Sequence, residues 1–275
     1  MAVVVLLALL LLPDYPKTSG ALPDIDNQAF ITDCVAVHNR LRSQVNPPAS
    51  DMRYMTWDEA LAKTAKAWAR TCQFGHNIYL KQAGKVHPTF TPVGENIWVG
   101  APSSTFSVSA AIEKWHGEVK DYRYSDRSCS RVCGHYTQVV WAKSYKVGCA
   151  VHICPSGITG FNTNSIPDPT IFVCNYGDAG NFPTHPYSAG PECRKCPGET
   201  CENKLCKKQT RDQSIGYADW NPDFGSGSGS GSDAASASCN SYFLAVVITR
   251  PLALVLIIAG VYGLQLVYPH VFAYE

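Results

Sequence analysis

The chain has 275 residues, 45% hydrophobic and 16% charged, so one compact domain and a small appendage are expected once terminal hydrophobic segments are set aside. Its 23 Lys and Arg residues balance 22 Asp and Glu residues, and the formal net charge is +1. Such an even balance excludes the basic field with which proteins hold nucleic acid or an acidic membrane surface. We therefore expect no nucleic-acid partner.

The N-terminus is predicted to be a secretory signal. Residues 2–12 form an apolar run that is too short to span a bilayer but has the length of a signal-peptide h-region. Small residues at Ser19, Gly20 and Ala21 offer a cleavage site, although the first residues contain no Lys or Arg. We assign residues 1–21 to a signal peptide and exclude them from the fold.

The cysteine content points to an oxidising compartment. Twelve cysteines together with a signal peptide indicate a disulfide framework. Eleven of them lie from Cys34 to Cys206, so at least one has no intramolecular partner in that region. Cys34 falls in a helix-like stretch that suits a buried thiol, and the spacing does not place Cys239, which lies close to the C-terminal hydrophobic segment.

Three helices are predicted in the first half of the chain. Residues 27–45 place apolar side chains at three-to-four spacing and end before two consecutive prolines. Residues 56–59 (TWDE) form a capping box, which predicts a second helix from there to Cys72. A third helix is expected over residues 107–122.

Strands are predicted to follow the helices. Residues 146–154 and 170–176 are short and rich in β-branched side chains, so we expect them to pair antiparallel across the Gly/Pro/Asn-rich loop between them. Helices first and strands later indicate an α+β layer fold. Residues 135–142 (HYTQVVWA) fit a short helix and a strand equally, and their periodicity leaves both open.

The composition changes after residue 190. Residues 193–206 hold four cysteines in a stretch too short to build an apolar core, so crosslinks must hold it together. We assign residues 22–190 to the main domain, 191–208 to a cysteine-rich hinge and 209–241 to a flexible linker, which contains a Gly-Ser repeat.

The C-terminal segment is predicted to anchor the chain in a membrane. It is apolar over residues 242–268, and Arg250-Pro251 interrupts it. The part beyond this break would form a helix of about 27 Å, close to the roughly 30 Å hydrocarbon thickness of a bilayer. We expect a single span, a short tail over residues 269–275 and an extracellular or lumenal main domain. The small residues 236–238, a polar spacer and the hydrophobic tail also fit a lipid-anchor signal, which would place the protein at the cell surface without a span.

Four motifs occur in order along the main domain: HNRLR at 38–42, GENIW at 94–98, GHYTQVVW at 134–141 and IFVCNYGDAGN at 171–181. In these motifs the chain resembles the CAP superfamily of cysteine-rich secretory proteins, antigen 5 and plant pathogenesis-related proteins. The resemblance covers about residues 22–187, and the four-cysteine tail is similar to the hinge of several members. It implies a three-layer α-β-α sandwich, the CAP or SCP domain, followed here by the small hinge and the hydrophobic anchor.

The resemblance also implies a cleft with two histidines and two acids, which in this chain are His76, Glu95, Glu118 and His135. Such a set can ligate a divalent metal such as zinc through two nitrogens and one carboxylate. It can equally form an acid/base cluster or a structural network in which buried polar groups satisfy one another. The four residues lie far apart in sequence and form no H-E-x-x-H pair, so their spacing does not choose among these roles.

The resemblance further implies a set of disulfides. The pairs are Cys72–Cys154, Cys129–Cys133, Cys149–Cys174, Cys193–Cys201 and Cys196–Cys206, with Cys34 and Cys239 left unpaired. A zinc knuckle is the alternative for the hinge cysteines, and secretion disfavours it.

Three other histidines are expected to be structural or solvated. His38 is predicted to be a helix residue bonded to the core. His87 and His185 lie beside prolines in loops and are predicted to be solvated.

We expect a membrane-tethered extracellular protein that binds an extracellular protein or lipid ligand rather than turning over a substrate. The sequence contains no G-x-S-x-G elbow and no lone cysteine of a recognisable catalytic family, which disfavours enzymatic activity. One alternative is a metal-dependent hydrolase with Glu95 or Glu118 as the general base on a zinc-bound water. A further alternative, which the resemblance implies, is sterol or fatty-acid binding.

Overall fold

A computed structural model of the chain describes residues 22–163 and 166–225. Its centre is a four-stranded sheet with the strand order β1-β5-β6-β2. The strands are β1 (Thr56–Trp57), β2 (Gly94–Gly100), β5 (Lys146–Ile153) and β6 (Thr170–Gly177). Strand β6 pairs antiparallel with both β5 and β2, and β1 runs parallel to β5. The predicted antiparallel pair is confirmed, and β2 is an additional strand that the periodicity does not indicate.

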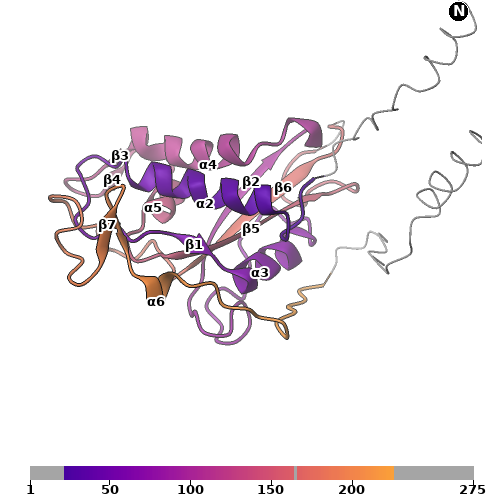
Figure 1. Cartoon of the computed structure of the whole chain (residues 1–275). Helices are drawn as coiled ribbons and strands as arrows, with labels where there is room; N and C mark the ends of the chain where they lie inside the picture. Colours follow the sequence, from indigo (N-terminus) through magenta and orange to yellow (C-terminus); the bar gives the residue numbers. More distant parts are fainter. Residues whose placement is uncertain (1–21, 164–165, 226–275) are drawn as a thin grey trace, which may run out of the picture. The chain divides into compact units, whose positions relative to one another are not determined.

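Helices cover both faces of this sheet (Figure 1). They are α2 (Gln28–Arg42), α3 (Glu59–Ala69), α4 (Val108–His116) and α5 (Gly134–Val139). The side chains of β6 alternate between two apolar clusters: Phe172 and Tyr176 pack with α2, α4 and α5, whereas Ile171 and Val173 pack with α3. Because successive side chains of a strand point to opposite faces, these clusters lie on the two sides of the sheet. The arrangement is the expected α-β-α sandwich.

The helix boundaries differ from the predicted ones in ways that the backbone explains. Helix α2 begins after Asn27, whose side chain accepts a hydrogen bond from Phe30 N. Helix α3 begins after Asp58 rather than Thr56, so the predicted capping box is wrong in register. The amides of Thr56 and Asp58 donate to carbonyls beside and in β5, which keeps this stretch extended, and Asp58 Oδ1 accepts from Leu61 N as the cap.

The two remaining helix predictions have different outcomes. Helix α4 is shorter than residues 107–122, because the chain tightens after His116 into the 3₁₀ turn η2 (Gly117–Asp121). The open choice at HYTQVVWA is settled as the short helix α5. The other elements are brief: η1 (Ser103–Thr105), β3 (Tyr122–Arg123), β4 (Ser128–Cys129), β7 (Thr200–Glu202), β8 (Leu205–Lys207) and α6 (Gln209–Asp212).

Five disulfides are present in the described residues, and they are the five pairs that the resemblance implies. They are Cys72–Cys154, Cys129–Cys133, Cys149–Cys174, Cys193–Cys201 and Cys196–Cys206. Cys149 and Cys174 face each other directly across β5 and β6. Cys34, on α2, is a free thiol buried in the apolar core.

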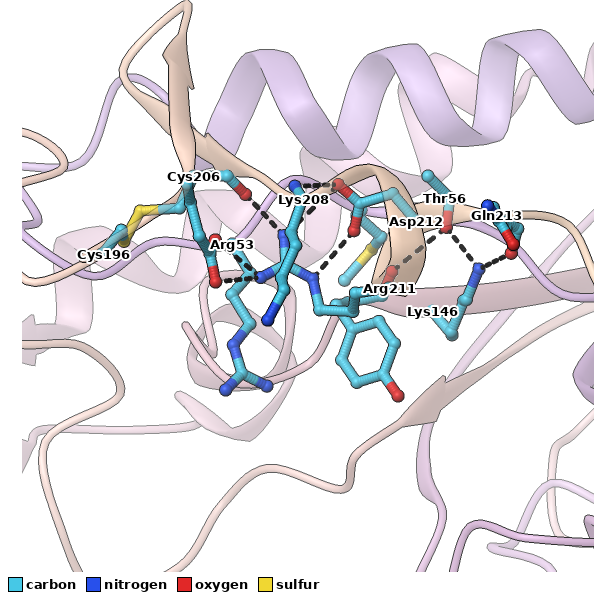
Figure 2. Close-up of polar contacts among 12 residues, drawn as sticks. Arg53, Thr56, Lys146, Cys196, Cys206, Lys208, Arg211, Asp212 and Gln213 are labelled. Carbon is cyan, nitrogen blue, oxygen red and sulfur yellow. Dashed lines mark hydrogen bonds and ion pairs between the residues drawn. A yellow bond between two sulfur atoms is a disulfide. The ribbon is translucent and has the colours of Figure 1, made fainter.

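The hinge packs against the main domain. Cys206 exchanges backbone hydrogen bonds with the segment before β1, accepting from Tyr54 N and donating to Met52 O. Leu205 and Cys206 are buried. Figure 2 shows Arg211 directly after the hinge, where its guanidinium donates to Cys206 O and pairs with Asp212.

Part of the predicted flexible linker also belongs to this packed structure. Residues 213–225 contact α3 through an edge-on ring contact and hydrogen bonds. The prediction of a linker from residue 209 is therefore wrong up to residue 225. The Gly-Ser repeat on which that prediction rests begins only at Gly225, and the residues before it include Tyr217, Trp220 and Phe224.

None of the helices in residues 22–163 and 166–225 is both long and apolar enough to cross a bilayer. The predicted anchor at 242–268, the signal peptide at 1–21 and Cys239 lie outside the described residues. These three assignments stay predictions.

Arg42 is a fully buried cation at the end of α2. Its guanidinium donates to five backbone carbonyls, those of Arg53, Val139, Trp141, Ala142 and Ser144. Burial lowers the pKa of Arg42 to about 9, which leaves the side chain charged at neutral pH. Four of the acceptors belong to the segment from the end of α5 to just before β5, so Arg42 fixes that connection against α2.

His38 is part of the core, as predicted. Its Nδ1 donates to Cys34 O at 2.7 Å, which makes Nε2 the acceptor of the hydrogen bond from the Tyr176 hydroxyl at 3.0 Å. Complete burial lowers the pKa of His38 to about 4. The ring is therefore neutral at physiological pH.

His87 is buried as well, contrary to its predicted solvation. Its Nδ1 accepts from the amides of Thr89 and Phe90, and its Nε2 donates to Asp58 Oδ1 at 3.2 Å. Both ring nitrogens have partners inside the protein. A position beside a proline in a loop therefore does not make this histidine solvated. His185, in contrast, is exposed.

Replacing Arg42 by Met is expected to lower the free energy of unfolding by about 3–5 kcal/mol, because it leaves several buried carbonyls without a donor. Urea unfolding at neutral pH measures this loss. Arg40→Met is the matched control, since Arg40 forms an exposed ion pair with Glu113. That change should cost no more than about 1 kcal/mol. Equal losses in both variants would contradict the role given to Arg42.

His38 is expected to make the protein less stable as the pH falls. Above the unfolded-state pKa of 6.5 both states are neutral at this position. Between pH 6.5 and about 4 the unfolded chain binds a proton that the folded chain refuses, which favours unfolding. From pH 7 to pH 4 the wild type should lose roughly 3 kcal/mol more than His38→Gln. A difference in unfolding free energy between the two proteins that stays constant from pH 7 to pH 4 would contradict this assignment.

Candidate functional site

Glu95 and His76 form the first half of the candidate site. Glu95 lies on β2 with its carboxylate buried, and Oε1 accepts from His76 Nδ1 at 3.0 Å and from Asn77 N at 2.9 Å. His76 lies in the loop after α3, and its side chain is 62% exposed. The buried acid therefore holds a histidine that faces solvent.

The loop that carries His76 is fixed on both sides. Cys72 at its start is bonded to Cys154, and the indole nitrogen of Trp68 donates to Gly75 O at 2.9 Å. Gln73 also forms a β-bridge with Thr159. This short loop can thus hold an exposed imidazole in one place, although it belongs to no helix or strand.

Glu118 and His135 form the second half. Glu118 projects from η2 to the start of α5, where Oε2 accepts from the amides of His135 at 3.0 Å and Tyr136 at 3.2 Å. Its other oxygen accepts from His135 Nδ1 at 2.6 Å. Since Cys133 supplies no side-chain cap, the carboxylate of Glu118 caps α5 and orients the imidazole at once.

Aromatic side chains pack against one face of the His135 ring. The ring stacks on Trp115 with centroids 6.3 Å apart, and Trp115 stacks on Phe172 at 5.4 Å. The indole nitrogen of Trp115 donates to Ile97 O in β2 at 3.2 Å. One face of the His135 ring thus packs on the core, while its side chain is partly exposed.

The two histidine–carboxylate pairs are linked through β2. Asn96, which follows Glu95, donates from Nδ2 to His135 O at 3.0 Å. The cavity beside the first pair has a volume of about 320 Å³, and its lining includes His76, Glu95, Lys81 and Phe182. Glu118 and His135 do not line this cavity, so the structure places the four predicted residues as two adjacent pairs.

The hydrogen bonds fix which nitrogen of each histidine is available. In both rings Nδ1 donates to a carboxylate, so Nε2 is the nitrogen with a free lone pair in the neutral form. No hydrogen bond to either Nε2 is found within residues 22–163 and 166–225. A carboxylate on Nδ1 with Nε2 free is the arrangement in which proteins present histidine to a metal ion.

The surroundings of Glu95 are short of partners. Within the described chain, Glu95 Oε2, Asn77 Nδ2 and both amide atoms of Asn175 are buried and make no hydrogen bond. Burial raises the pKa of Glu95, against the polar contacts with His76, Asn77 and Asn175, which lower it. The hydrogen bond that His76 donates to Glu95 raises the pKa of His76. The site therefore keeps polar capacity that the protein itself does not use.

The ligand set predicted from the resemblance is only partly assembled. Across the described residues, three ligand atoms of His, Cys, Asp or Glu lie within 4.8 Å of one another in a single group, that of Cys196, Glu199 and Cys206. The sulfurs of this group form a disulfide and Glu199 pairs with Arg211, so it is not a metal site. Two nitrogens and a carboxylate are not gathered at the cleft, because both acids face the Nδ1 side. The donor chemistry of two imidazoles with free Nε2 atoms suits a divalent metal, although the described ligand atoms are not gathered around one ion.

Three asparagines complete this site, and none of them is among the site residues predicted from the sequence. Asn77, Asn96 and Asn175 contact or neighbour Glu95, Asn175 as its direct partner across β2 and β6. The available signal was the polar Asn175 in the otherwise apolar run TIFVCNY, since a buried amide within a strand requires a polar neighbour.

Comparisons with known proteins agree with this fold. The model of the cysteine-rich secretory protein family, CAP, matches residues 35–176. GLIPR1-like protein 1 of Bos taurus is 52% identical over 207 residues, which cover 75% of this chain and 83% of that protein. Glioma pathogenesis-related protein 1 of Mus musculus is 51% identical over 209 residues, covering 74% and 76%. The crystal structure of NaASP2 with Zn²⁺ is 27% identical with a TM-score of 0.52 and covers 67% of this chain and 100% of that one.

Proposed function

Since the chain belongs to the cysteine-rich secretory protein family, CAP, we propose that it is an extracellular binding protein whose ligand contacts the cleft at His76 and Glu95. The observation that carries this proposal is the pair of histidines, each held at Nδ1 by a carboxylate and each left with Nε2 free. Histidines fixed in this way serve to bind a ligand or a metal ion without a change of protein conformation.

We propose zinc as the metal that this site accepts. His76 and His135 would hold it through Nε2, with Glu95 and Glu118 in the supporting role described above. Bound zinc would supply a positive charge and a Lewis acid to which an acidic or carbonyl group of a partner could attach. The related NaASP2 was solved with Zn²⁺, which supports the choice of metal. Two imidazoles without a protein carboxylate favour weak rather than structural binding.

The lining of the cavity indicates the class of partner. Lys81 and His76 provide basic groups, whereas Leu80, Pro92 and the half-exposed ring of Phe182 provide apolar surface. A ligand that carries an acidic group next to an apolar one fits this combination. An extracellular protein segment and a lipid such as a fatty acid both have this chemistry, and we propose the protein segment as the partner.

Hydrolysis is the less supported alternative. A general base on a metal-bound water needs a carboxylate oxygen that faces the water. Both oxygens of Glu118 already accept hydrogen bonds from His135 and from backbone amides, and the free oxygen of Glu95 is buried. These contacts support a role of the acids in orienting the histidines rather than in activating a nucleophile.

A zinc titration by calorimetry on residues 22–225 tests the proposal. We expect the wild type to bind zinc. Binding should weaken at least about tenfold in His76→Ala and in His135→Ala, because each variant loses one nitrogen ligand. His185→Ala is the control, because this exposed histidine lies outside the site. Equal zinc binding in all four proteins would mean that zinc contacts other groups. No binding by the wild type, with the two site variants less stable, would make the cluster a structural network.

The mode of membrane attachment is proposed from the sequence. We propose that residues 242–268 tether the extracellular domain as a single span, because they combine an apolar stretch of sufficient length with Arg250 at its outer part. Treatment of intact cells with a phosphatidylinositol-specific phospholipase should leave the protein on the cells. Release of the protein into the medium would replace the span by a lipid anchor.

A further inference from the structure

The segment after the hinge lies across helix α3 as an irregular chain. This segment, residues 213–225, is called the strap below. Its start is fixed where Lys146 Nζ donates to Gln213 O at 2.6 Å, as Figure 2 shows. From there its residues run past α3 without helix or strand. The contacts described next are separate from the candidate cleft.

Three aromatic side chains anchor the strap. Tyr217 places its ring edge-on to His87 with centroids 5.2 Å apart. Trp220 donates from Nε1 to Thr64 Oγ1 of α3 at 3.2 Å. Phe224 stacks on Tyr79 at 5.5 Å and meets Trp68 edge-on at 6.0 Å. The anchors thus follow the spacing i, i+3 and i+7 and occupy separate positions on one surface.

The strap is attached mainly by these rings. Among the described residues its backbone makes few bonds to the domain. Besides the bond from Lys146 to Gln213 O, Lys63 Nζ donates to Tyr217 O at 2.8 Å, and Tyr217 N donates to Glu59 Oε2 at 3.5 Å. All three anchor residues stay partly exposed. Attachment through a few aromatic side chains without a backbone ladder is typical of peptide recognition rather than of a core element.

Charge contributes little to the contact between the strap and α3. The strap contains Asp219 and Asp223 and no Lys or Arg. On helix α3, Lys63 and Lys66 already pair with Glu59 and Asp24. The aromatic rings therefore carry the attachment, since exposed ion pairs add little affinity.

We infer that the surface formed by α3, Tyr79 and His87 is a binding site for short peptides with three aromatic residues, and that the strap is its resident ligand. The site is independent of the proposed metal cleft. The tethered strap competes with any peptide from outside, because its effective concentration at the surface is high. A partner segment of the same chemistry would have to displace it.

A fluorescent peptide of residues 213–225 tests this inference on the full chain. Tyr217→Ala/Trp220→Ala/Phe224→Ala weakens the resident strap, and we expect this variant to bind the peptide at least about tenfold more tightly than the wild type does in fluorescence anisotropy. Adding Tyr79→Ala to the variant should reverse most of the gain. A peptide with the same three alanines should not bind, whereas a peptide with Ile215→Ala should bind normally, since Ile215 is 56% exposed.

Trp220→Ala alone guards against a folding defect in the triple variant, because Trp220 belongs to none of the apolar core clusters. It should bind the peptide more tightly than the wild type, though less tightly than the triple variant. Equal binding to the wild type and both variants, or no binding to a folded Trp220→Ala protein, would overturn the inference. A wild-type dimer that dissociates in the triple variant would also overturn it, since the strap would then occupy a second copy.

Discussion

The short helix α5 depends on charged side chains at both of its ends, and much of the site depends on α5. A helix of six residues is too short to be stable alone. Glu118 accepts from amides at its start, and Arg42 donates to carbonyls at and beyond its end. A carboxylate at the N-terminus and a cation at the C-terminus both complement the helix dipole. Because Glu118 also bonds to the His135 ring, the contact that stabilises the helix aligns the histidine.

In the other half of the site, too, one carboxylate fixes both a backbone amide and a histidine ring. Glu95 extends from a strand, and its single carboxylate fixes the amide of Asn77 and the ring of His76. Each histidine therefore depends on a residue from a different element, η2 in one case and β2 in the other. Rigidity comes from burying the acids while the histidines stay accessible, and this division suits a binding surface.

Sequence patterns predicted the parts of the fold in which neighbours along the chain decide the structure. Helix α2 and the β5·β6 pair follow from periodicity, and family motifs supplied the disulfides and the four site residues. Where long-range contacts decide, the patterns were insufficient. Asp58 replaced Thr56 as a cap because β1 pairs with β5, and His87 is buried because Asp58 and two amides surround it. Nor could spacing reveal that both acids lie on the Nδ1 side of the histidines, since that depends on how η2 and β2 are placed.

The way in which the strap is attached determines how the molecule responds to a mechanical load. A pull on the chain beyond Gly225 reaches Phe224 first, then Trp220 and then Tyr217, so the anchors give way one at a time rather than together. The next point of resistance is the Arg211 network, followed by Cys206, where a disulfide carries the load covalently. The strap can therefore extend before the hinge is loaded, and the disulfide limits how far residues 196–206 can be drawn out.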